Sequence, residues 1–330
     1  MRPEPRPLPT ETATPQDSVL ALDIGGTGLK GAVVDRTLAP VETLRVSTPR
    51  AEGPSAVVDA VTDLLTELRR RAHDRGLHPL HAGVVVPGIV DEARGRVLWA
   101  VNLGWRDLPL AAELEQRTGL RVTLGHDVRA GGTAEFLHGA ARGARNALFV
   151  ALGTGVAAAL VCDGVAVTSD GYAGELGHLV VDPQGLPCRC GGVGCLETVA
   201  SASAVVAGYN VAAERAVPGA VEVAALARRG DPIAQAVWER AVEGLAKALA
   251  SAATLLAPER IVLGGGLAEA GPLLLDPLRV ALADRLTFQR RPVVVRAALG
   301  DHAGRAGAGI AAWRSAGLDT TAARLPAPAL

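Results

Sequence analysis

Apolar residues along the first part of the chain form short runs that end at glycine or aspartate. The runs at 18–26 (SVLALDIGG), 27–35 (TGLKGAVVD) and 41–47 (VETLRVS) each have the length and the boundaries of a β-strand. Because only a few residues separate them, we expect the ordered chain to open with antiparallel hairpins.

A helical pattern follows. Between Ser55 and Arg71 the apolar side chains recur at helical spacing, which predicts one buried helix face: Val57, Val58, Val61, Leu64, Leu65 and Leu68. Ser55 is a candidate N-cap for this helix. A buried strand is predicted next, at His81–Gly88, ending in a Pro-Gly turn.

The same order of elements recurs later. An apolar strand, a Gly-Thr-Gly turn and a second apolar strand lie within Ala147–Gly164, a long helix is predicted from Asp231 to about Leu256, and the segment 259–267 (ERIVLGGGL) gives a strand that ends in three glycines. This repetition predicts an α/β protein built from two duplicated domains that face each other across a cleft.

Length and charge agree with a protein of two domains and give no support to a nucleic-acid-binding or membrane-spanning protein. A chain of 330 residues can form two cores, and a net charge of −1 without a basic block gives no reason to expect a nucleic-acid partner. No apolar run is long enough to span a bilayer, and the Pro- and Thr-rich leader at 1–17 has no secretory signal, so we expect it to be disordered. Three of the four cysteines crowd into eight residues, which favours a reduced, cytoplasmic setting.

The first glycine turn is a candidate phosphate loop. In the segment Asp23–Lys30 (DIGGTGLK), glycines let backbone N–H groups approach phosphate oxygens, Thr27 adds a hydroxyl donor, and Asp23 can hold a magnesium ion through water. A plain hairpin without a ligand is the alternative. The spacing matches neither a P-loop nor a dinucleotide fingerprint.

Two further glycine turns strengthen this interpretation. Gly153-Thr154-Gly155 can grip a polyphosphate from the other side, and the triple glycine 264–266 offers a flat surface for an adenine. The candidate ATP-binding residues are therefore Asp23, Gly25, Gly26, Thr27, Lys30, Gly153, Thr154, Gly155, Gly264, Gly265 and Gly266.

A metal site is predicted from the cysteines. Cys188, Cys190 and Cys195 have the pattern C-x-C-x4-C with His178 ten residues upstream, and three thiolates and one imidazole complete the tetrahedral shell of a structural zinc. Buried reduced cysteines, or a disulfide between near neighbours, are the alternatives, and neither gives the histidine a place. Cys162 stands alone on an apolar strand, where core packing is expected.

These motifs resemble a known family. DIGGTGLKGAVVD, ALGTGV and VLGGGL are similar to the phosphate-1, phosphate-2 and adenosine motifs of the actin-like (ribonuclease-H-like) ATPases, and GELGH followed by CRCGGVGCLE resembles the hallmark of the ROK family of repressors and sugar kinases. The resemblance covers Val19 to Trp313. It implies a cytoplasmic kinase that closes on Mg-ATP and a hexose and forms a homodimer or homotetramer.

The resemblance also implies domain limits. A small N-terminal α/β domain spans 18–128 and is completed by a C-terminal helix at about 303–316. A large α/β domain with the zinc loop spans 129–302, and a flexible tail follows at 317–330.

Site residues follow from the same resemblance. Asp127, after the apolar stretch LRVTL and before a helical run, matches the catalytic base that takes the proton of the 6-hydroxyl; a helix N-cap is the alternative role. The positions that match contacts to the sugar are Gly88, Asn102, His126, Asp127, Glu175, His178 and Glu197.

The chain departs from the family pattern at the base. Family kinases read Asn-Asp where this chain has His126-Asp127, so an imidazole replaces an amide that holds a sugar hydroxyl. Arg129, two residues on, can contact a phosphate or stabilise the adjoining carboxylate. Gly28 makes the first loop similar to that of polyphosphate glucokinases, which keeps polyphosphate open as a donor.

Three functions are therefore compared. The first is a hexose kinase of the glucokinase type, with glucose the leading substrate and N-acetylhexosamine, mannose or fructose as alternatives. The second is a sugar-responsive repressor, for which the 22 residues before Asp23 are too few to form a helix-turn-helix domain. The third is a catalytically silent sugar-binding protein, which the substitution at His126 keeps open.

Overall fold

The computed structural model describes residues 14, 16–318 and 320, so most of the expected leader at 1–17 and of the expected tail at 317–330 lies outside the described residues. Contacts divide the chain into two units. Unit 1 holds the residues up to Ala130 and those from Gly304 on, and unit 2 is Gly131–Ala303. Among the helices of the described part, none combines the length and the apolar character that crossing a membrane requires.

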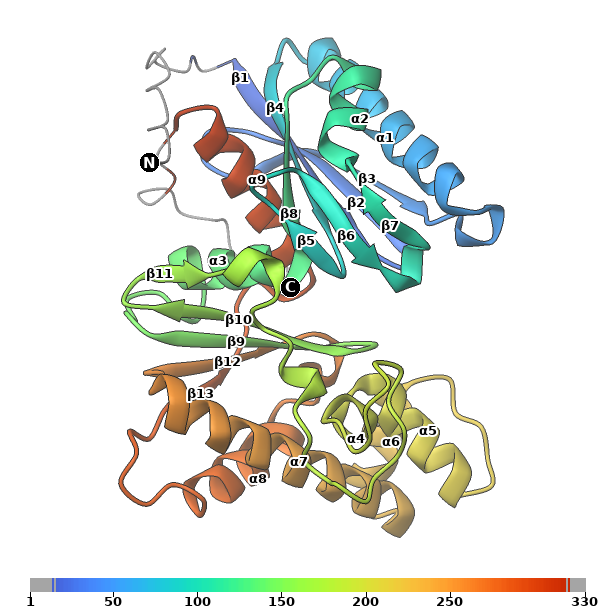
Figure 1. Cartoon of the computed structure of the whole chain (residues 1–330), viewed down its shortest axis with the longest axis vertical. Helices are drawn as coiled ribbons and strands as arrows, with labels where there is room; N and C mark the ends of the chain where they lie inside the picture. Colours follow the sequence, from blue (N-terminus) through green and yellow to red (C-terminus); the bar gives the residue numbers. More distant parts are fainter. Residues whose placement is uncertain (1–13, 15, 319, 321–330) are drawn as a thin grey trace. The chain divides into compact units, whose positions relative to one another are not determined.

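Unit 1 is built on a five-stranded sheet of order β3-β2-β1-β4-β8 (Figure 1). Its strands are β1 (Asp17–Ile24), β2 (Gly28–Val34), β3 (Pro40–Ser47), β4 (His78–Val86) and β8 (Val122–His126). β1, β2 and β3 pair antiparallel, as the hairpins in the sequence predicted, whereas β4 and β8 run parallel to β1.

Helices cover both faces of this sheet. α1 (Pro54–Asp74) and α2 (Leu110–Thr118) lie on one face, where a Cβ atom at Gly31 of β2 would collide with the Leu68 side chain of α1. α9 (Ala303–Ser315) lies on the other face and approaches so closely that a Cβ at Gly83 of β4 would stand 2.0 Å from the carbonyl oxygen of Ala308.

The predicted buried face of α1 is confirmed, since its six apolar residues between Val57 and Leu68 are all buried. The predicted N-cap is wrong. The cap is Gly53, with φ of 104°, and Pro54 occupies the first turn, so Ser55 lies inside the helix. Proline starts the helix there because its ring already holds a helical φ and its missing N–H needs no partner.

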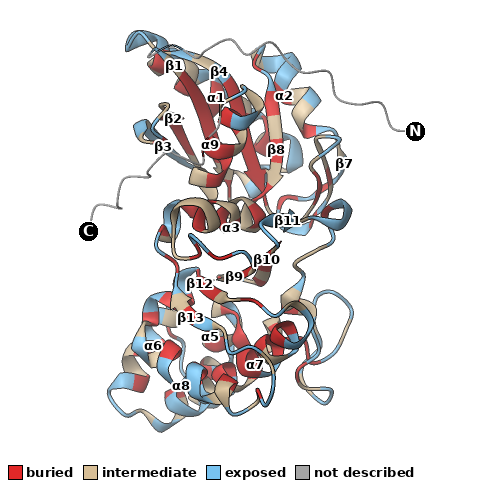
Figure 2. Cartoon of the chain, turned by 90° about the vertical axis from the view of Figure 1, so that its left-hand side faces the viewer, coloured by how far each residue is buried: buried red, intermediate tan, exposed pale blue. Residues whose placement is uncertain are grey.

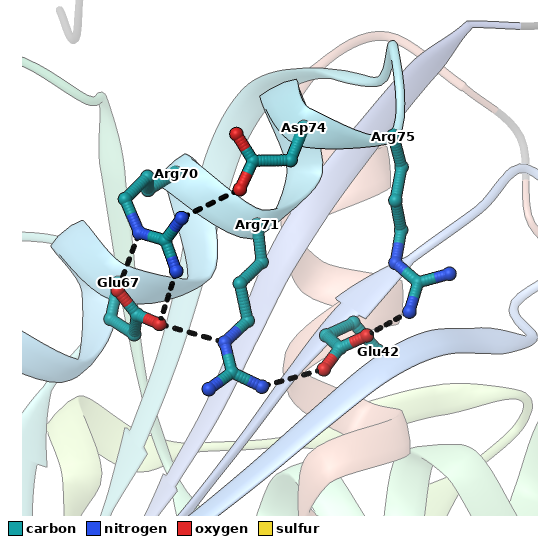
Figure 3. A network of polar contacts seen from close by, with 6 residues as sticks. All are labelled: Glu42, Glu67, Arg70, Arg71, Asp74 and Arg75. Atoms are coloured by element: carbon teal, nitrogen blue, oxygen red, sulfur yellow. Dashed lines mark hydrogen bonds and ion pairs between the residues drawn. The ribbon is translucent and has the colours of Figure 1, made fainter.

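An ionic network ties the outer face of α1 to β3 (Figure 3). Glu42 of β3 accepts hydrogen bonds from Arg71 and Arg75, and Arg71 also reaches Glu67, which pairs with Arg70. These arginines are between 36% and 58% exposed, so water screens the pairs and each adds little to the stability of the fold.

A small antiparallel sheet follows β4. Its strands are β5 (Ile89–Asp91), β6 (Arg96–Ala100) and β7 (Trp105–Leu108), and the 3₁₀ turn η2 (Val101–Leu103) joins the last two. This sheet matters for the site because it carries Glu92 and Asn102 to the carboxyl ends of the central strands of unit 1.

Unit 2 repeats the architecture of unit 1. Its sheet has the order β11-β10-β9-β12-β13, with antiparallel pairing of β9, β10 and β11 and parallel pairing of β9, β12 and β13. The strands are β9 (Ala147–Leu152), β10 (Val156–Cys162), β11 (Val165–Val167), β12 (Arg260–Gly264) and β13 (Val293–Arg296). The α/β class and the duplication predicted from the repeated pattern are thereby confirmed.

Helices of unit 2 pack on both faces of its sheet, and Figure 2 shows many buried residues along α7. α7 (Pro232–Leu256) matches its prediction, with the Asp231 carboxylate accepting from the backbone N–H of Ala234. α3 (Asp127–His138) starts in unit 1 and continues into unit 2, where a Cβ at Gly132 would collide with Ala159 of β10. The remaining helices of unit 2 are α4 (Glu197–Ala200), α5 (Ala202–Ala212), α6 (Ala220–Arg228) and α8 (Pro272–Ala283), and its 3₁₀ turns include η3 (Ser169–Gly171), η4 (Leu176–His178) and η5 (Gly266–Ala270).

Candidate active site and metal centre

The carboxyl ends of the parallel strands of unit 1 carry the predicted site residues. β1, β4 and β8 are neighbours in the sheet, with Asp23 of β1 opposite Val85 and Val86 opposite His126. Asp23, Gly88 and Asp127 therefore stand at one edge of the sheet. This is the edge at which open α/β sheets bind their ligands.

The first glycine turn is a tight hairpin between β1 and β2. The N–H of Gly25 donates to the carbonyl of Gly28 at 2.9 Å, and the Thr48 hydroxyl donates to the carbonyl of Gly25 at 2.7 Å. Gly26 lies at its tip, where a Cβ atom would be 3.8 Å from the Cβ of Asn102 and 3.9 Å from a guanidinium nitrogen of Arg50. The structure thus brings a predicted phosphate loop next to a predicted sugar ligand. Lys30 lies opposite Asp23 in the β1–β2 pairing.

Gly88 occupies a position that only glycine fits. Its φ is 104°, and a Cβ atom would stand 2.2 Å from the carbonyl oxygen of Trp99. The absence of a side chain lets the turn after β4 lie directly on β6, the strand that leads to Asn102.

Asp127 is the last predicted residue at this edge and the first residue of α3. Its Oδ1 accepts from the N–H of the next residue, Val128, at 2.7 Å. An N-cap accepts from the N–H two or three residues on, and here that contact is made by His126, whose Nδ1 accepts from the N–H of Arg129, so the alternative role of Asp127 as N-cap is wrong. Although 28% of the side chain is exposed, desolvation by the surrounding protein raises the pKa of Asp127 to about 6, against the lowering effects of the Val128 N–H and the Arg129 charge. A carboxylate with such a pKa is a better proton acceptor at neutral pH than an ordinary aspartate.

Buried polar groups surround Asp127. The Nε2 atom of His126 lies 3.4 Å from Asp127 Oδ1, and the Arg129 guanidinium donates to Glu92 Oε1 at 2.9 Å and to the carbonyl of Val90 at 3.3 Å. Of the two roles left open for Arg129, these contacts favour the electrostatic one, because its charge acts on the pKa of Asp127 from a buried position.

The second glycine turn, in unit 2, joins β9 and β10. Gly153 donates to the carbonyl of Gly155 at 3.0 Å, and the Glu197 carboxylate accepts from the N–H of Val156 at 2.9 Å. A Cβ at Gly155 would collide with that carboxylate, so the structure places Glu197 directly against the hairpin.

The triple glycine lies beside this hairpin. Gly264 pairs with Ala151 in the parallel β9–β12 ladder, and Gly265, with φ of 83°, packs on the backbone of Leu152. A Cβ added at Gly153 or at Gly266 would meet nothing within 4 Å. The two loops thus form one glycine-lined edge of the unit 2 sheet.

The predicted metal ligands come together in unit 2. Ligand atoms of His178, Cys188, Cys190 and Cys195 all lie within 4.8 Å of one another. Cys190 Sγ is 3.7 Å from Cys195 Sγ, and Cys188 Sγ is 3.7 Å from His178 Nδ1. Thiolates bound to one tetrahedral zinc stand about 3.8 Å apart, so the donor set and its spacing fit this metal. The cysteines are free, which rules out the disulfide alternative in this structure.

Local backbone geometry builds this cluster. The N–H of Cys188 donates to the carbonyl of Gly192 at 2.8 Å, and a Cβ at Gly194 would stand 1.6 Å from the carbonyl of Asp182. Burial raises the pKa of the Cys195 thiol to about 12, and a bound cation is what lowers such a pKa. Cys162 lies on β10, outside the cluster.

The His178 ring connects this cluster to a predicted sugar ligand. While Nδ1 faces Cys188, Nε2 lies 3.8 Å from the Glu175 carboxylate. Metal-binding histidines commonly direct their second nitrogen to a carboxylate, which sets the tautomer and turns the ring.

Two residues of this region were missed in the sequence. Glu92 lies in a turn after β5 and Arg50 in η1 (Arg50–Glu52), and neither belongs to a motif. Strand pairing in the small sheet brings Glu92 to Arg129, and the pairing of β3 with β2 brings Arg50 to Gly26. A charged residue in a turn carries no signal of such a role.

Comparison with known proteins finds relatives over most of the chain. The model of the ROK family matches residues 19–314. A glucokinase from Halalkalibacterium halodurans is 34% identical over 275 residues, covering 79% of this chain and 83% of that protein. An N-acetylmannosamine kinase from Citrobacter koseri is 34% identical over 258 residues, covering 76% and 85%. The crystal structure of a ROK family glucokinase from Streptomyces griseus in complex with glucose and AMPPNP superposes with a TM-score of 0.78 at 31% identity, covering 90% and 99%.

Proposed function

Because the chain belongs to the ROK family, as the match over residues 19–314 shows, we propose that this sugar kinase transfers the γ-phosphoryl group of ATP to the 6-hydroxyl of a hexose, with glucose as the leading substrate. The observation that carries the proposal is Asp127. Its carboxylate stands at the ligand-binding edge of the unit 1 sheet with a pKa of about 6.

In the proposed reaction the Asp127 carboxylate accepts the proton of the 6-hydroxyl. That oxygen forms a bond to the γ-phosphorus while the bond from the γ-phosphorus to the bridging oxygen of ATP breaks, and ADP leaves. Phosphoryl transfer of this kind depends mainly on positioning and on charge stabilisation, which agrees with a site made largely of backbone N–H groups and a single base.

We assign the nucleotide to the glycine turns. Gly25, Gly26, Thr27 and Lys30 would contact the phosphates, Asp23 would bind the magnesium of Mg-ATP through water, and the turn at Gly153–Gly155 would bind phosphate as well. Gly264–Gly266 would lie along the adenosine. The support is the open space at the turns: a Cβ at Gly153 or Gly266 would meet nothing within 4 Å, and one at Gly26 would meet nothing nearer than 3.8 Å.

The sugar would be held by polar side chains. We assign Asn102, Glu175, His178 and Glu197 to its hydroxyls and the backbone at Gly88 to a further contact, since carboxylates and amides bind vicinal hydroxyls well. Asn102 lies beside Gly26, and Glu197 lies against Gly155, so each has a predicted phosphate loop as its neighbour.

We further propose that His178, Cys188, Cys190 and Cys195 hold a structural zinc. Four protein ligands leave no position for a reacting water, so the metal would supply rigidity rather than chemistry. It would set the start of α4, which carries Glu197 two residues after Cys195.

Asp127→Asn tests the function. The variant keeps the shape of the side chain and removes the base, so we expect kcat to fall by about 10²- to 10⁴-fold in a coupled ADP-release assay while glucose still binds by calorimetry. Asp107→Asn, an exposed residue of β7, is the matched control and should retain full activity. Equal activity of the two variants would remove Asp127 from the role of base.

A kinase for an N-acetylhexosamine is the second candidate, and the relative from Citrobacter koseri favours it. A panel of glucose, mannose, fructose, N-acetylglucosamine and N-acetylmannosamine, each with ATP and with polyphosphate, separates the candidates by kcat/KM. Sugar binding without turnover across the whole panel would favour the silent sugar-binding protein. We infer a cytoplasmic location from the free thiols and the need for ATP.

A further inference from the structure

His126, Arg129 and Glu92 form a connected group behind Asp127, within unit 1. His126 ends β8, Arg129 lies in the first turn of α3, and Glu92 follows β5. The side chains of His126 and Arg129 are only 7% and 6% exposed, whereas that of Glu92 is 34% exposed. A buried guanidinium requires a carboxylate partner, and Glu92 provides it at 2.9 Å.

The backbone determines which nitrogen of His126 carries the proton. The N–H of Arg129 donates to His126 Nδ1 at 3.3 Å, and a backbone N–H can only donate. In the neutral ring the proton is therefore on Nε2, the atom that lies 3.4 Å from Asp127 Oδ1. The distance is at the long end for a hydrogen bond, and the protonated nitrogen of His126 is the one that lies beside the base.

Glu92 fixes the other side of this arrangement. Its Oε1 accepts both from Arg129 and from the backbone N–H of His126, at 3.1 Å. Oε1 of Glu92 therefore holds both the end of β8, before Asp127, and the first turn of α3, after it. Arg129 also donates to the carbonyl of Val90, so two acceptors in and just after β5 hold its position.

We propose that His126, Arg129 and Glu92 act as positioning residues for Asp127, with His126 donating from Nε2 to Oδ1 so that Oδ2 is the oxygen that takes the substrate proton. This rests on the proposed function. His126 is then not a sugar ligand in this chain, although the resemblance to the family assigns the position to a sugar contact.

The electrostatics agree with this arrangement. Burial, followed by the Arg129 charge, lowers the pKa of His126 to about 4 against the opposing effect of Glu92, so the ring is neutral at physiological pH. A neutral ring can donate to Asp127 without adding a second positive charge. Within unit 1, the charge that acts directly on the pKa of Asp127 is that of Arg129. Glu92 is the counter-charge of Arg129.

The first test needs no turnover. In protein labelled with ¹⁵N-histidine, and with His126→Gln to assign the signal, we expect the His126 ring to stay neutral with its proton on Nε2 from pH 5 to pH 9. A proton on Nδ1, or titration near pH 6.5, would overturn the proposal. This readout stands even if the chain has no kinase activity, so it separates failure of the arrangement from failure of the proposed function.

The second test uses kinetics. In His126→Leu we expect kcat to fall at least tenfold with the hexose KM within twofold of wild type, and His126→Gln, which restores an N–H donor, should recover part of the loss. A KM that rises with kcat unchanged would show a sugar ligand instead and would overturn the proposal.

The third test uses the charges. Arg129→Gln removes the cation that lowers the pKa of Asp127, so the acidic limb of the kcat/KM profile should move to higher pH. Glu92→Gln keeps an oxygen acceptor but removes the counter-charge of Arg129, so the limb should move to lower pH. If the two residues were merely structural, the acidic limb would not move in opposite directions in the two variants. A shift of the limb in the same direction in both would contradict the proposal.

Discussion

At the scale of single residues, the properties of Asp127 depend on its neighbours. An aspartate in water has a pKa near 3.8, and burial in this fold raises the pKa of Asp127 to about 6 against the effects of two backbone N–H groups and one arginine. The residue type and its place after an apolar strand were readable in the sequence. The shift was not, because desolvation depends on which atoms surround the carboxylate after folding.

The pH dependence follows from this shift. If Asp127 is the base, kcat/KM should fall about tenfold per pH unit below pH 6 and level off above it, as the deprotonated fraction does. Initial rates between pH 4.5 and pH 8.5 measure this. A flat profile down to pH 5 would show that the group has an ordinary pKa.

The same shift predicts a stability effect. Because the folded-state pKa is raised, the neutral carboxyl is favoured by the fold; this contribution is present below pH 4 and is lost as the pH rises through 6. At pH 8 the free energy of unfolding of Asp127→Asn, measured in urea, should therefore exceed that of wild type by about 1–3 kcal/mol. This difference should shrink at pH 4.5. A larger free energy of unfolding for wild type than for the variant at pH 8 would contradict this prediction.

At the scale of elements, strands and helices followed from the periodicity of apolar residues, and their exact ends did not. The helix after the first hairpins was expected from Ser55, whereas α1 begins at Pro54 behind a glycine cap. Propensity favours serine as a cap, but the sharp entry of the chain at Gly53 decides the start. Likewise β4 begins at His78, three residues before the expected strand, because pairing with β1 extends it.

Two glycines allow a matched test of backbone strain against packing. Gly53 and Gly88 both have φ of 104°, but a Cβ at Gly53 meets nothing within 4 Å, whereas at Gly88 it would meet the Trp99 carbonyl at 2.2 Å. Alanine at either position carries the strain of the positive φ, and only Gly88→Ala adds the collision. We expect Gly88→Ala to lose about 1–3 kcal/mol more stability than Gly53→Ala in urea unfolding. Equal losses would show that β6 moves aside.

At the scale of the whole molecule, the duplication explains why the motifs recur. The two sheets share one strand order, and a glycine hairpin opens each of them, so the first and second glycine turns are equivalent positions of one architecture. The family membership expected from these motifs is confirmed by the match over residues 19–314.

Metal content tests the cluster in the intact protein. We expect one zinc per chain in the purified wild type. Cys195→Ser should lose the metal and unfold several degrees lower, because a structural zinc contributes directly to folding free energy. Cys162→Ser, a cysteine outside the cluster, is the control and should keep both zinc and melting temperature. Equimolar zinc in Cys195→Ser would mean that the metal is held elsewhere.

The sequence by itself determined the α/β class, the duplication, the glycine turns and the candidate metal ligands. These depend on residue type and spacing over short stretches: apolar runs of strand length, glycines where a backbone must stay clear, and three cysteines close enough in sequence to share one metal. Such features are local, and local chemistry can be read in order along the chain.

Only the tertiary structure decided what surrounds each of these groups. It paired Glu92 with Arg129, 37 residues away, and set Glu197 against Gly155, 42 residues before it. These contacts join segments that are distant in the chain, and no periodicity encodes them. They arise from the order of strands in each sheet, which is settled only when the cores pack.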